Sequence, residues 1–325
     1  MNKIWIPLFF VIFLDIKPLY ACDACSIYSS EKVQGELTEG VTTITPPSLG
    51  LVRTGIVEQF TYFGTIKDGG RKVSNDTGQY LNSSITQLFL AYQITQAFSF
   101  QANFPLINRT YQRPNGFSTD RGSESGIGDA SLLGQWAVHQ DYNFSWNLFG
   151  GLKLPTGNAS RIAEELSETD SNNEAPASAI HGHDLALGTG SYDIIIGTNG
   201  RVHSGRFILP ANIQYAIRTL GSYGYRYADD FAWQLVPGYY ALLQPTYSGI
   251  LGVSISGELK GNDTFRGNVA SDTGTSAIYL GPQISLTVGE KMSAMVGFDL
   301  PVLQNETSLQ IVPDTRIKAL FSAQL

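Results

Sequence analysis

Long stretches of this chain alternate apolar and polar side chains with a period of two. From Tyr142 to Lys153, aromatic and aliphatic residues fall on one parity, and the other parity includes Asn143, Ser145, Asn147 and Lys153. Residues of one parity share one face of a β-strand. Each alternating stretch has about 10 to 14 residues, whereas strands of globular proteins usually have five or six. Because a tilted membrane strand needs about 9 to 11 residues, the pattern predicts strands that cross an outer membrane.

The spacing of these stretches gives a second constraint. Short links such as 139–141 and 203–205 alternate with long polar links such as 108–126 and 155–190. Outer-membrane barrels combine short periplasmic turns with longer extracellular loops. We therefore expect an all-β fold, a transmembrane antiparallel up-and-down β-barrel of about 12 strands that occupies residues 50–325. The expected strands lie near 50–63, 82–94, 97–106, 127–138, 142–154, 191–201, 206–218, 229–242, 246–259, 276–288, 291–302 and 314–325.

The N-terminus predicts export. Residues 1–21 contain a basic start, an apolar run from Ile4 to Leu14, and a small residue, Ala21, before Cys22. These are the parts of a cleavable signal peptide, and the run is too short to span a bilayer as a helix. Residues 22–49 would then form an N-terminal periplasmic segment. With an even number of strands, both termini of the barrel are expected on the periplasmic side of the bacterial outer membrane.

Composition agrees with a protein that meets lipid. Only 15% of the residues are charged, and the formal net charge is -7. Soluble domains carry about a quarter charged residues, and nucleic-acid-binding proteins carry a basic footprint that is missing here. We expect outer-membrane lipid and a small-molecule solute as partners, and no nucleic acid. A soluble β-sandwich is the rival fold, but it would need the same overlong strands and the same alternation of loop lengths by accident.

Three ordered motifs carry a resemblance to a known family. They are Gly126-Ile-Gly-Asp129, Gly150-Gly-Leu-Lys-Leu-Pro-Thr-Gly157 and Leu187-Gly-Thr-Gly-Ser-Tyr-Asp193. Together with the chain that follows them, they resemble the outer-membrane transporter family named for the MetA-pathway of phenol degradation. The resemblance implies a transmembrane β-barrel that acts as a channel for small and even hydrophobic or aromatic compounds, and it brings no catalytic residues. The same residues also fit a conformational role, since glycine and proline mark strand ends.

The parity that faces inward predicts the lining of a pore. It mixes uncharged polar groups with charges of both signs, which favours passive passage of small solutes without strong ion selectivity. A barrel of about twelve strands is narrower than a 16-stranded porin, so only small solutes would pass. The predicted pore-lining residues are Asn143, Ser145, Asn147, Lys153, Gln214, Arg218, Ser254, Ser256, Glu258, Gln283, Asp299, Arg316 and Lys318.

Two pairs of residues suggest metal handling as an alternative function. Cys22 and Cys25 form a Cys-x-x-Cys pair, which fits a disulfide, a soft-metal clasp for Cu(I) or Zn, or lipidation at Cys22. His181 and His183 lie in the longest loop and could share a metal ion. Neither pair is a complete ligand set, so we expect no resident cofactor beyond a soft metal at the cysteines.

A barrel enzyme is the third class that we considered. The sequence contains neither a Gly-x-Ser-x-Gly elbow nor a His-Glu-x-x-His motif. We therefore expect no enzyme activity. The sequence does not define an oligomeric state.

Overall fold

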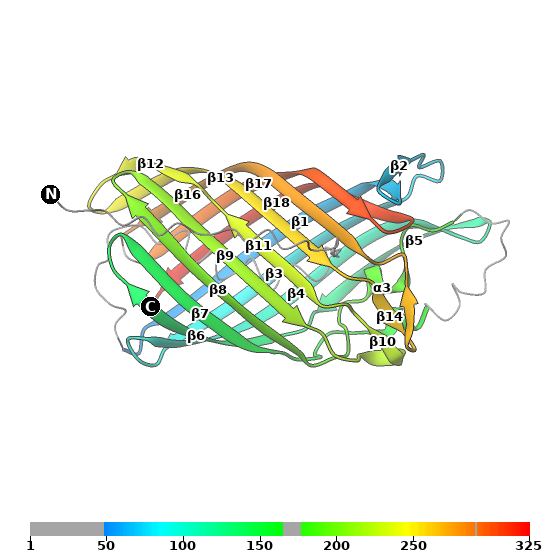
Figure 1. Ribbon diagram of the computed structural model, residues 1–325, viewed down its shortest axis with the longest axis horizontal. Helices are drawn as coiled ribbons and strands as arrows, with labels where there is room; N and C mark the ends of the chain where they lie inside the picture. The colour runs from blue at the N-terminus through cyan, green and yellow to red at the C-terminus, as the bar shows by residue number, and fades with distance from the viewer. Residues whose placement is uncertain (1–48, 165–176, 290) are drawn as a thin grey trace, which may run out of the picture.

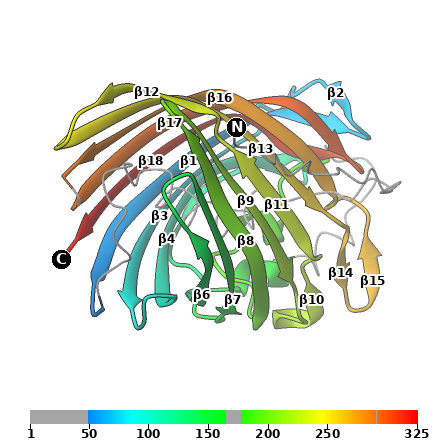
Figure 2. The ribbon, with the colours of Figure 1, turned by 60° about the vertical axis from the view of Figure 1, so that its left-hand side comes forward.

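The strands form one closed wall in the computed structural model, which describes residues 49–164, 177–289 and 291–325 (Figures 1 and 2). The wall has twelve antiparallel strands, which confirms the expected fold. Its strands are β1 (Val52–Asp68), β3 (Tyr80–Gln93), β4 (Phe98–Asn115), β5 (Ser118–Ile127) with β6 (Ser131–Gln140), β7 (Phe144–Lys153), β8 (Asp193–Ser204), β9 (Phe207–Ile217), β11 (Asp230–Leu235) with β12 (Gly238–Leu243), β13 (Tyr247–Lys260), β16 (Thr275–Val288), β17 (Met292–Glu306) and β18 (Gln310–Gln324).

The first and last strands close the barrel. β1 pairs with β18 from Arg53↔Gln324 to Lys67↔Gln310, and it pairs with β3 on its other edge. Leu325 donates its backbone N–H to Val52 O, so the C-terminus lies beside the start of β1. This end carries the short turns, and we call it the turn end. The opposite end, on the right in Figure 1, carries the longer connections, and we call it the loop end.

Two of the twelve strands in the wall are each divided into two pieces. The stretch expected near 229–242 is divided into β11 and β12 at Val236 and Pro237. Pro237 has no N–H to donate to the ladder, and it lies at the break between the two pieces. The stretch expected near 127–138 begins within β5 and continues as β6, and the two pieces flank Gly128–Ala130. Both breaks leave the pairing of the barrel intact.

Several strands extend further at the loop end than the sequence pattern predicts. The link expected over 108–126 is a hairpin in which β4 pairs with β5 from Leu106↔Ile127 to Asn115↔Ser118. The expected link 303–313 is also mostly strand, within β17 and β18. The prediction was wrong here for a physical reason. At this end of β4 the outward side chains, such as Thr110 and Gln112, are polar, so the apolar alternation that reveals membrane strands is lost.

The remaining elements gather at the loop end. They are the short strand β2 (Arg71–Val73), the 3-10 helices η1 (Ser160–Glu164) and η2 (Ser222–Gly224), the helix α3 (Gly182–Leu185), and a separate sheet of β10 (Tyr225–Arg226), β14 (Asp263–Phe265) and β15 (Asn268–Ala270). No helix in the described part of the chain has the length and apolar character needed to cross a membrane.

Candidate functional site: the polar lumen and its inserted loop

Twelve of the thirteen predicted pore-lining residues are buried on the inward side of the wall. Their parity is opposite to that of the exposed apolar side chains, such as Leu148, Ile213 and Val253. Asn143 is the exception, because it lies in the exposed turn before β7. The inward residues are Ser145, Asn147, Lys153, Gln214, Arg218, Ser254, Ser256, Glu258, Gln283, Asp299, Arg316 and Lys318.

An aromatic band marks the outer face near the turn end. Trp146 points outward with 41% of its surface exposed, and its indole N–H donates to Thr198 Oγ1 at 2.8 Å. Phe144, Phe207 and Tyr239 are also exposed at this level. Aromatic girdles of this kind lie at the membrane–water interface of outer-membrane barrels. The band therefore places the lipid boundary close to the short turns.

A chain of five buried charges joins neighbouring strands near the loop end. Lys153 Nζ lies 2.6 Å from Asp129 Oδ2 and 2.9 Å from Asp193 Oδ2. Asp193 Oδ2 also accepts a hydrogen bond of 2.9 Å from Arg218, and Arg218 Nε donates to Asp230 Oδ2 at 2.8 Å. Buried carboxylates are tolerated when they are paired in this way. These ion pairs thus fix the spacing of five adjacent strands of the wall.

The sequence also indicates this row of paired charges, although the alternation of polar and apolar residues does not reveal it. Asp129, Lys153, Asp193, Arg218 and Asp230 stand at the loop ends of successive strands, and their charges alternate in sign along the sequence. Because successive strands are neighbours in an up-and-down barrel, such alternation places opposite charges side by side. Of the five, only Lys153 and Arg218 were predicted to line the lumen, whereas Asp129 and Asp193 were noted as the ends of two motifs.

The three family-like motifs meet at Asp129. Its Oδ1 accepts the backbone N–H of Gly157 at 2.9 Å, and its Oδ2 accepts the backbone N–H of Thr189 at 2.9 Å. Lys153 from the second motif donates to Oδ2 as well. A Cβ on Gly188 would lie 2.6 Å from Asp129 Oδ1 and 2.6 Å from Gly157 Cα, so only glycine fits there. The motifs therefore hold together the two ends of the loop at 155–190.

That loop lies inside the wall rather than above it. Its two described parts, 155–164 and 177–190, are called here the inserted loop. Ile180 and Leu185 are fully buried and pack against Phe63, Leu81 and Tyr111, which point inward from β1, β3 and β4. The 3-10 helix η1 lies in the first described part of the loop, and Ile162 of η1 is also buried. The inserted loop narrows the loop end of the lumen.

Arginines tie the inserted loop to the β4–β5 hairpin. Arg113 donates to Glu164 Oε2 at 2.6 Å, and Arg161 Nε donates to Glu124 Oε1 at 2.9 Å. Arg161 also contacts Glu164 within η1. Burial alone would lower the pKa of the Arg161 guanidinium, but its hydrogen bonds to Glu124 and Glu164 outweigh burial and raise that pKa above its ordinary value. The tether is therefore ionic at any physiological pH.

A second polar cluster lies on the β13, β16 and β18 wall. Arg316 donates to Glu258 Oε1 at 2.6 Å and lies over the ring of Tyr279 at 3.7 Å from the centroid. The Tyr279 hydroxyl donates to the same carboxylate oxygen at 2.8 Å. Lys318 Nζ lies 2.6 Å from Asp299 Oδ2 on the next strand pair. The charges predicted for the lumen are thus engaged with each other.

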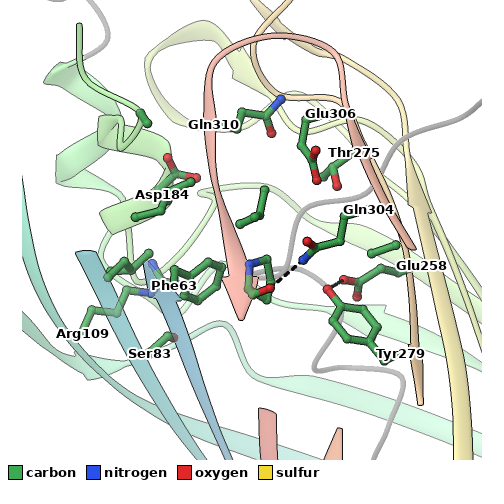
Figure 3. A pocket seen from close by; sticks show the side chains of 16 residues that line it. Phe63, Ser83, Arg109, Asp184, Glu258, Thr275, Tyr279, Gln304, Glu306 and Gln310 are labelled. Carbon is green, nitrogen blue, oxygen red and sulfur yellow. Dashed lines mark hydrogen bonds between the residues drawn. The ribbon is translucent and has the colours of Figure 1, made fainter. Parts of the chain in front are cut away.

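A cavity of about 50 Å³ opens between the inserted loop and strands β16 to β18 (Figure 3). One side is polar and includes Thr275, Gln304, Glu306 and Gln310. The remaining lining residues are Phe63, Leu81, Ser83, Arg109, Ala179, Asp184, Glu258, Ala277, Tyr279, Ile311, Val312 and Pro313. No sequence pattern indicated this cavity, because it forms only where the inserted loop meets the wall.

The histidines of the predicted metal pair do lie together. The rings of His181 and His183 are stacked, with centroids 5.6 Å apart and an interplanar angle of 7°. A carboxylate lies close to each ring: Asp272 is 3.5 Å from His181, and Asp184 is 3.4 Å from His183. Within the described residues, no three His, Cys, Asp or Glu side chains form a group that could hold a metal ion. Cys22 and Cys25, like the predicted signal peptide, lie outside the described residues.

Comparison with known proteins supports the fold. No family model matches the chain, and no curated protein matches it in sequence. The COG4313 outer membrane channel from Pseudomonas putida F1 superposes with a TM-score of 0.63 and 17% identity, over 87% of this chain and 98% of that structure. The β domain of the Bordetella autotransporter BrkA gives a TM-score of 0.49 at 9% identity, over 84% of this chain and all of that one. The chain therefore has the fold of a bacterial outer-membrane β-barrel.

Proposed function

We propose that this protein is an outer-membrane channel for the passive passage of small solutes, and that it is not an enzyme. The observation that carries the proposal is the contrast between the two faces of the wall. Outward side chains such as Ile213 and Val253 are apolar and exposed, whereas inward ones such as Asn147 and Gln214 are polar. A polar interior inside a closed barrel provides a route that water and polar solutes can share.

The inserted loop gives this channel a constriction. It is seated by apolar contacts at Ile180 and Leu185 and by the ion pairs of Arg113 and Arg161. These contacts narrow the loop end, so passage is restricted to small molecules. Selectivity by charge is expected to be weak, because the inward Lys and Arg side chains are paired with carboxylates. We place the turn end in the periplasm and the loop end outside the cell, as the loop lengths favour.

The similarity to the Pseudomonas putida channel agrees with this proposal, and so does the family resemblance of the three motifs. A metal-handling function receives less support. The two stacked histidines have no third ligand grouped with them among the described residues.

Permeability of the purified protein tests the proposal directly. The protein would be refolded in detergent, inserted into planar bilayers, and compared with liposomes that contain no protein. We expect discrete conductance steps in KCl, and swelling of proteoliposomes in small neutral solutes but not in solutes too large for the constriction. A folded, inserted barrel that adds no conductance and no solute permeability would show that the proposal is wrong.

A further inference from the structure

The cavity beside the inserted loop contains a buried carboxylate without hydrogen-bond partners. Glu306 is the last residue of β17 and is only 3% exposed. Within the described residues, neither of its carboxylate oxygens accepts a hydrogen bond. The nearest cation is Lys67, whose Nζ lies 3.9 Å away and donates instead to Gln304 O at 3.0 Å. A buried carboxylate left in this state is costly, and a ligand that donates hydrogen bonds would stabilise it.

The polar groups near Glu306 are mostly acceptors. Gln304 Nε2 donates to Pro313 O at 2.6 Å, and Gln310 Nε2 donates to Gly274 O at 3.0 Å. Each amide therefore uses one N–H of its nitrogen and keeps its oxygen as an acceptor, beside a second N–H. Thr275, the register partner of Glu306 on β16, adds a hydroxyl. Figure 3 shows Gln310, Glu306, Thr275 and Gln304 along one side of the cavity.

The other groups that face the cavity are already engaged or apolar. Arg109 donates to Ala186 O in the inserted loop, and Glu258 is bound by Arg316 and Tyr279. Phe63, Ile311 and Val312 supply apolar surface. The cavity therefore offers a cluster of acceptors beside an apolar wall.

We propose that this cavity binds a small primary ammonium group, with Glu306 as its principal partner. An ammonium has three N–H donors, no acceptor and a positive charge, which complements the acceptors described above. An alcohol or a water molecule brings fewer donors and adds an acceptor. The volume of about 50 Å³ admits only a few non-hydrogen atoms, such as methylammonium or ethylammonium. The inference rests on the proposed channel, since it names a solute class for its loop end.

The affinity is expected to be weak. Two or three non-hydrogen atoms limit the dissociation constant to about 0.5 to 6 mM at best. Lys67 opposes the binding of a cation, because it offsets part of the charge of Glu306. A low-affinity binding site is compatible with passage, because a solute that binds tightly leaves the channel too slowly.

Ligand-observed NMR on the full-length protein in detergent micelles tests the site without any need for conductance. Saturation transfer to ethylammonium chloride would be titrated against tetramethylammonium chloride and ethanol at matched ionic strength. We expect saturable transfer to ethylammonium. Tetramethylammonium has no N–H donor, so it should show no saturable signal. Equal binding of tetramethylammonium or of ethanol would overturn the inference, and so would no saturable binding of ethylammonium.

Variants then assign the binding to Glu306. Glu306→Gln keeps the shape and removes the charge, so the affinity for ethylammonium should fall by about tenfold. Asp68→Asn removes an exposed carboxylate at the end of β1, also at the loop end, and should leave the affinity unchanged. If Glu306→Gln does not fold, Thr275→Val removes one acceptor and should still weaken binding severalfold. Unchanged affinity in the folded variants would overturn the assignment.

The two proposals fail separately. A protein that binds ethylammonium but adds no permeability would contradict the channel and leave the site standing. A protein that conducts but shows no saturable binding of ethylammonium would contradict the site alone.

Discussion

Lys153 Nζ lies 2.6 Å from Asp129 Oδ2, and both side chains are almost completely buried. The pair joins the break between β5 and β6 to the end of β7, and Asp129 in turn accepts hydrogen bonds from the inserted loop at Gly157 and Thr189. One ion pair thus couples the wall of the barrel to the loop that narrows it. The inward parity of Lys153 agrees with the sequence pattern, but its ammonium is held by carboxylates rather than by open water.

Lys153→Met is therefore expected to destabilise the barrel. It leaves Asp129 and Asp193 without their shared cation, and breaking a buried ion pair from one side costs about 3 to 5 kcal/mol. Guanidinium unfolding in micelles, followed by tryptophan fluorescence, measures the change. Lys291→Met, in an exposed short turn, is the matched control and should change stability very little. A Lys153→Met protein as stable as the wild type would mean that the buried pair does not contribute to folding.

Gly188→Ala should loosen the inserted loop. The added Cβ would lie 2.6 Å from the backbone of Gly157 and from Asp129 Oδ1, and backbone atoms cannot move aside cheaply. We expect faster trypsin cleavage near Arg161 in the folded, membrane-inserted protein. Gly261→Ala is the control, because its Cβ would meet only Ala228 Cβ at 3.5 Å, an ordinary contact. Equal cleavage rates for the two variants would contradict the role given to Gly188.

Sequence alone could predict the membrane part of the wall. Between Phe144 and Lys153 lipid lies on one side and the lumen on the other, so polarity alternates and reveals the strand. Along β4 and β5 beyond the membrane this contrast disappears, and the hairpin there was expected to be a loop. The alternation of apolar and polar residues does not reveal a strand whose outward side chains are polar as well.

The candidate site, too, could be predicted only in part from the sequence. The inward orientation of Gln214 and Arg218 follows from the alternation of residues within one strand, which the local sequence shows. The partner of Arg218 depends on which strands are neighbours, although alternating charge signs at successive strand ends would have indicated Asp193 and Asp230. Glu306 could not be found at all. Its cavity depends on where a loop more than a hundred residues away in sequence is seated, and no pattern near position 306 encodes that.

The outward face should tolerate charge only near its ends. Ile213 lies halfway along β9 and is 47% exposed, so Ile213→Arg places a cation in the apolar band at a cost of about 2 to 4 kcal/mol. Phe207→Arg, at the turn end of the same strand, should cost about 0 to 1 kcal/mol. The stability of the two variants is compared by the temperature at which the fast-migrating folded form disappears on SDS gels. Equal losses would mean that the lipid boundary has been placed wrongly.

Release of the arginine tether should widen the channel without unfolding it. Arg161 is partly exposed and binds Glu124 on the β4–β5 hairpin, so Arg161→Gln loosens η1, which stays attached through the Arg113–Glu164 ion pair and the buried Ile162. We expect a higher single-channel conductance and unchanged thermal stability within a few degrees.

The tether should not respond to pH in the physiological range. The folded-state pKa of Arg161 is raised, so its contribution to the stability of the tether is complete below the ordinary arginine pKa and is lost only as pH rises through the raised value. Deprotonation of Arg161 therefore cannot open the channel between pH 6 and 10. Salt screens partly exposed ion pairs, so raised salt should loosen the tether of the wild type. After correction for bulk conductivity, we expect the conductance of the wild type to rise more with salt than that of Arg161→Gln. If the wild type opened as pH rose over that range, or if the variant conducted like the wild type at low salt, the tether would not be what holds the inserted loop in place.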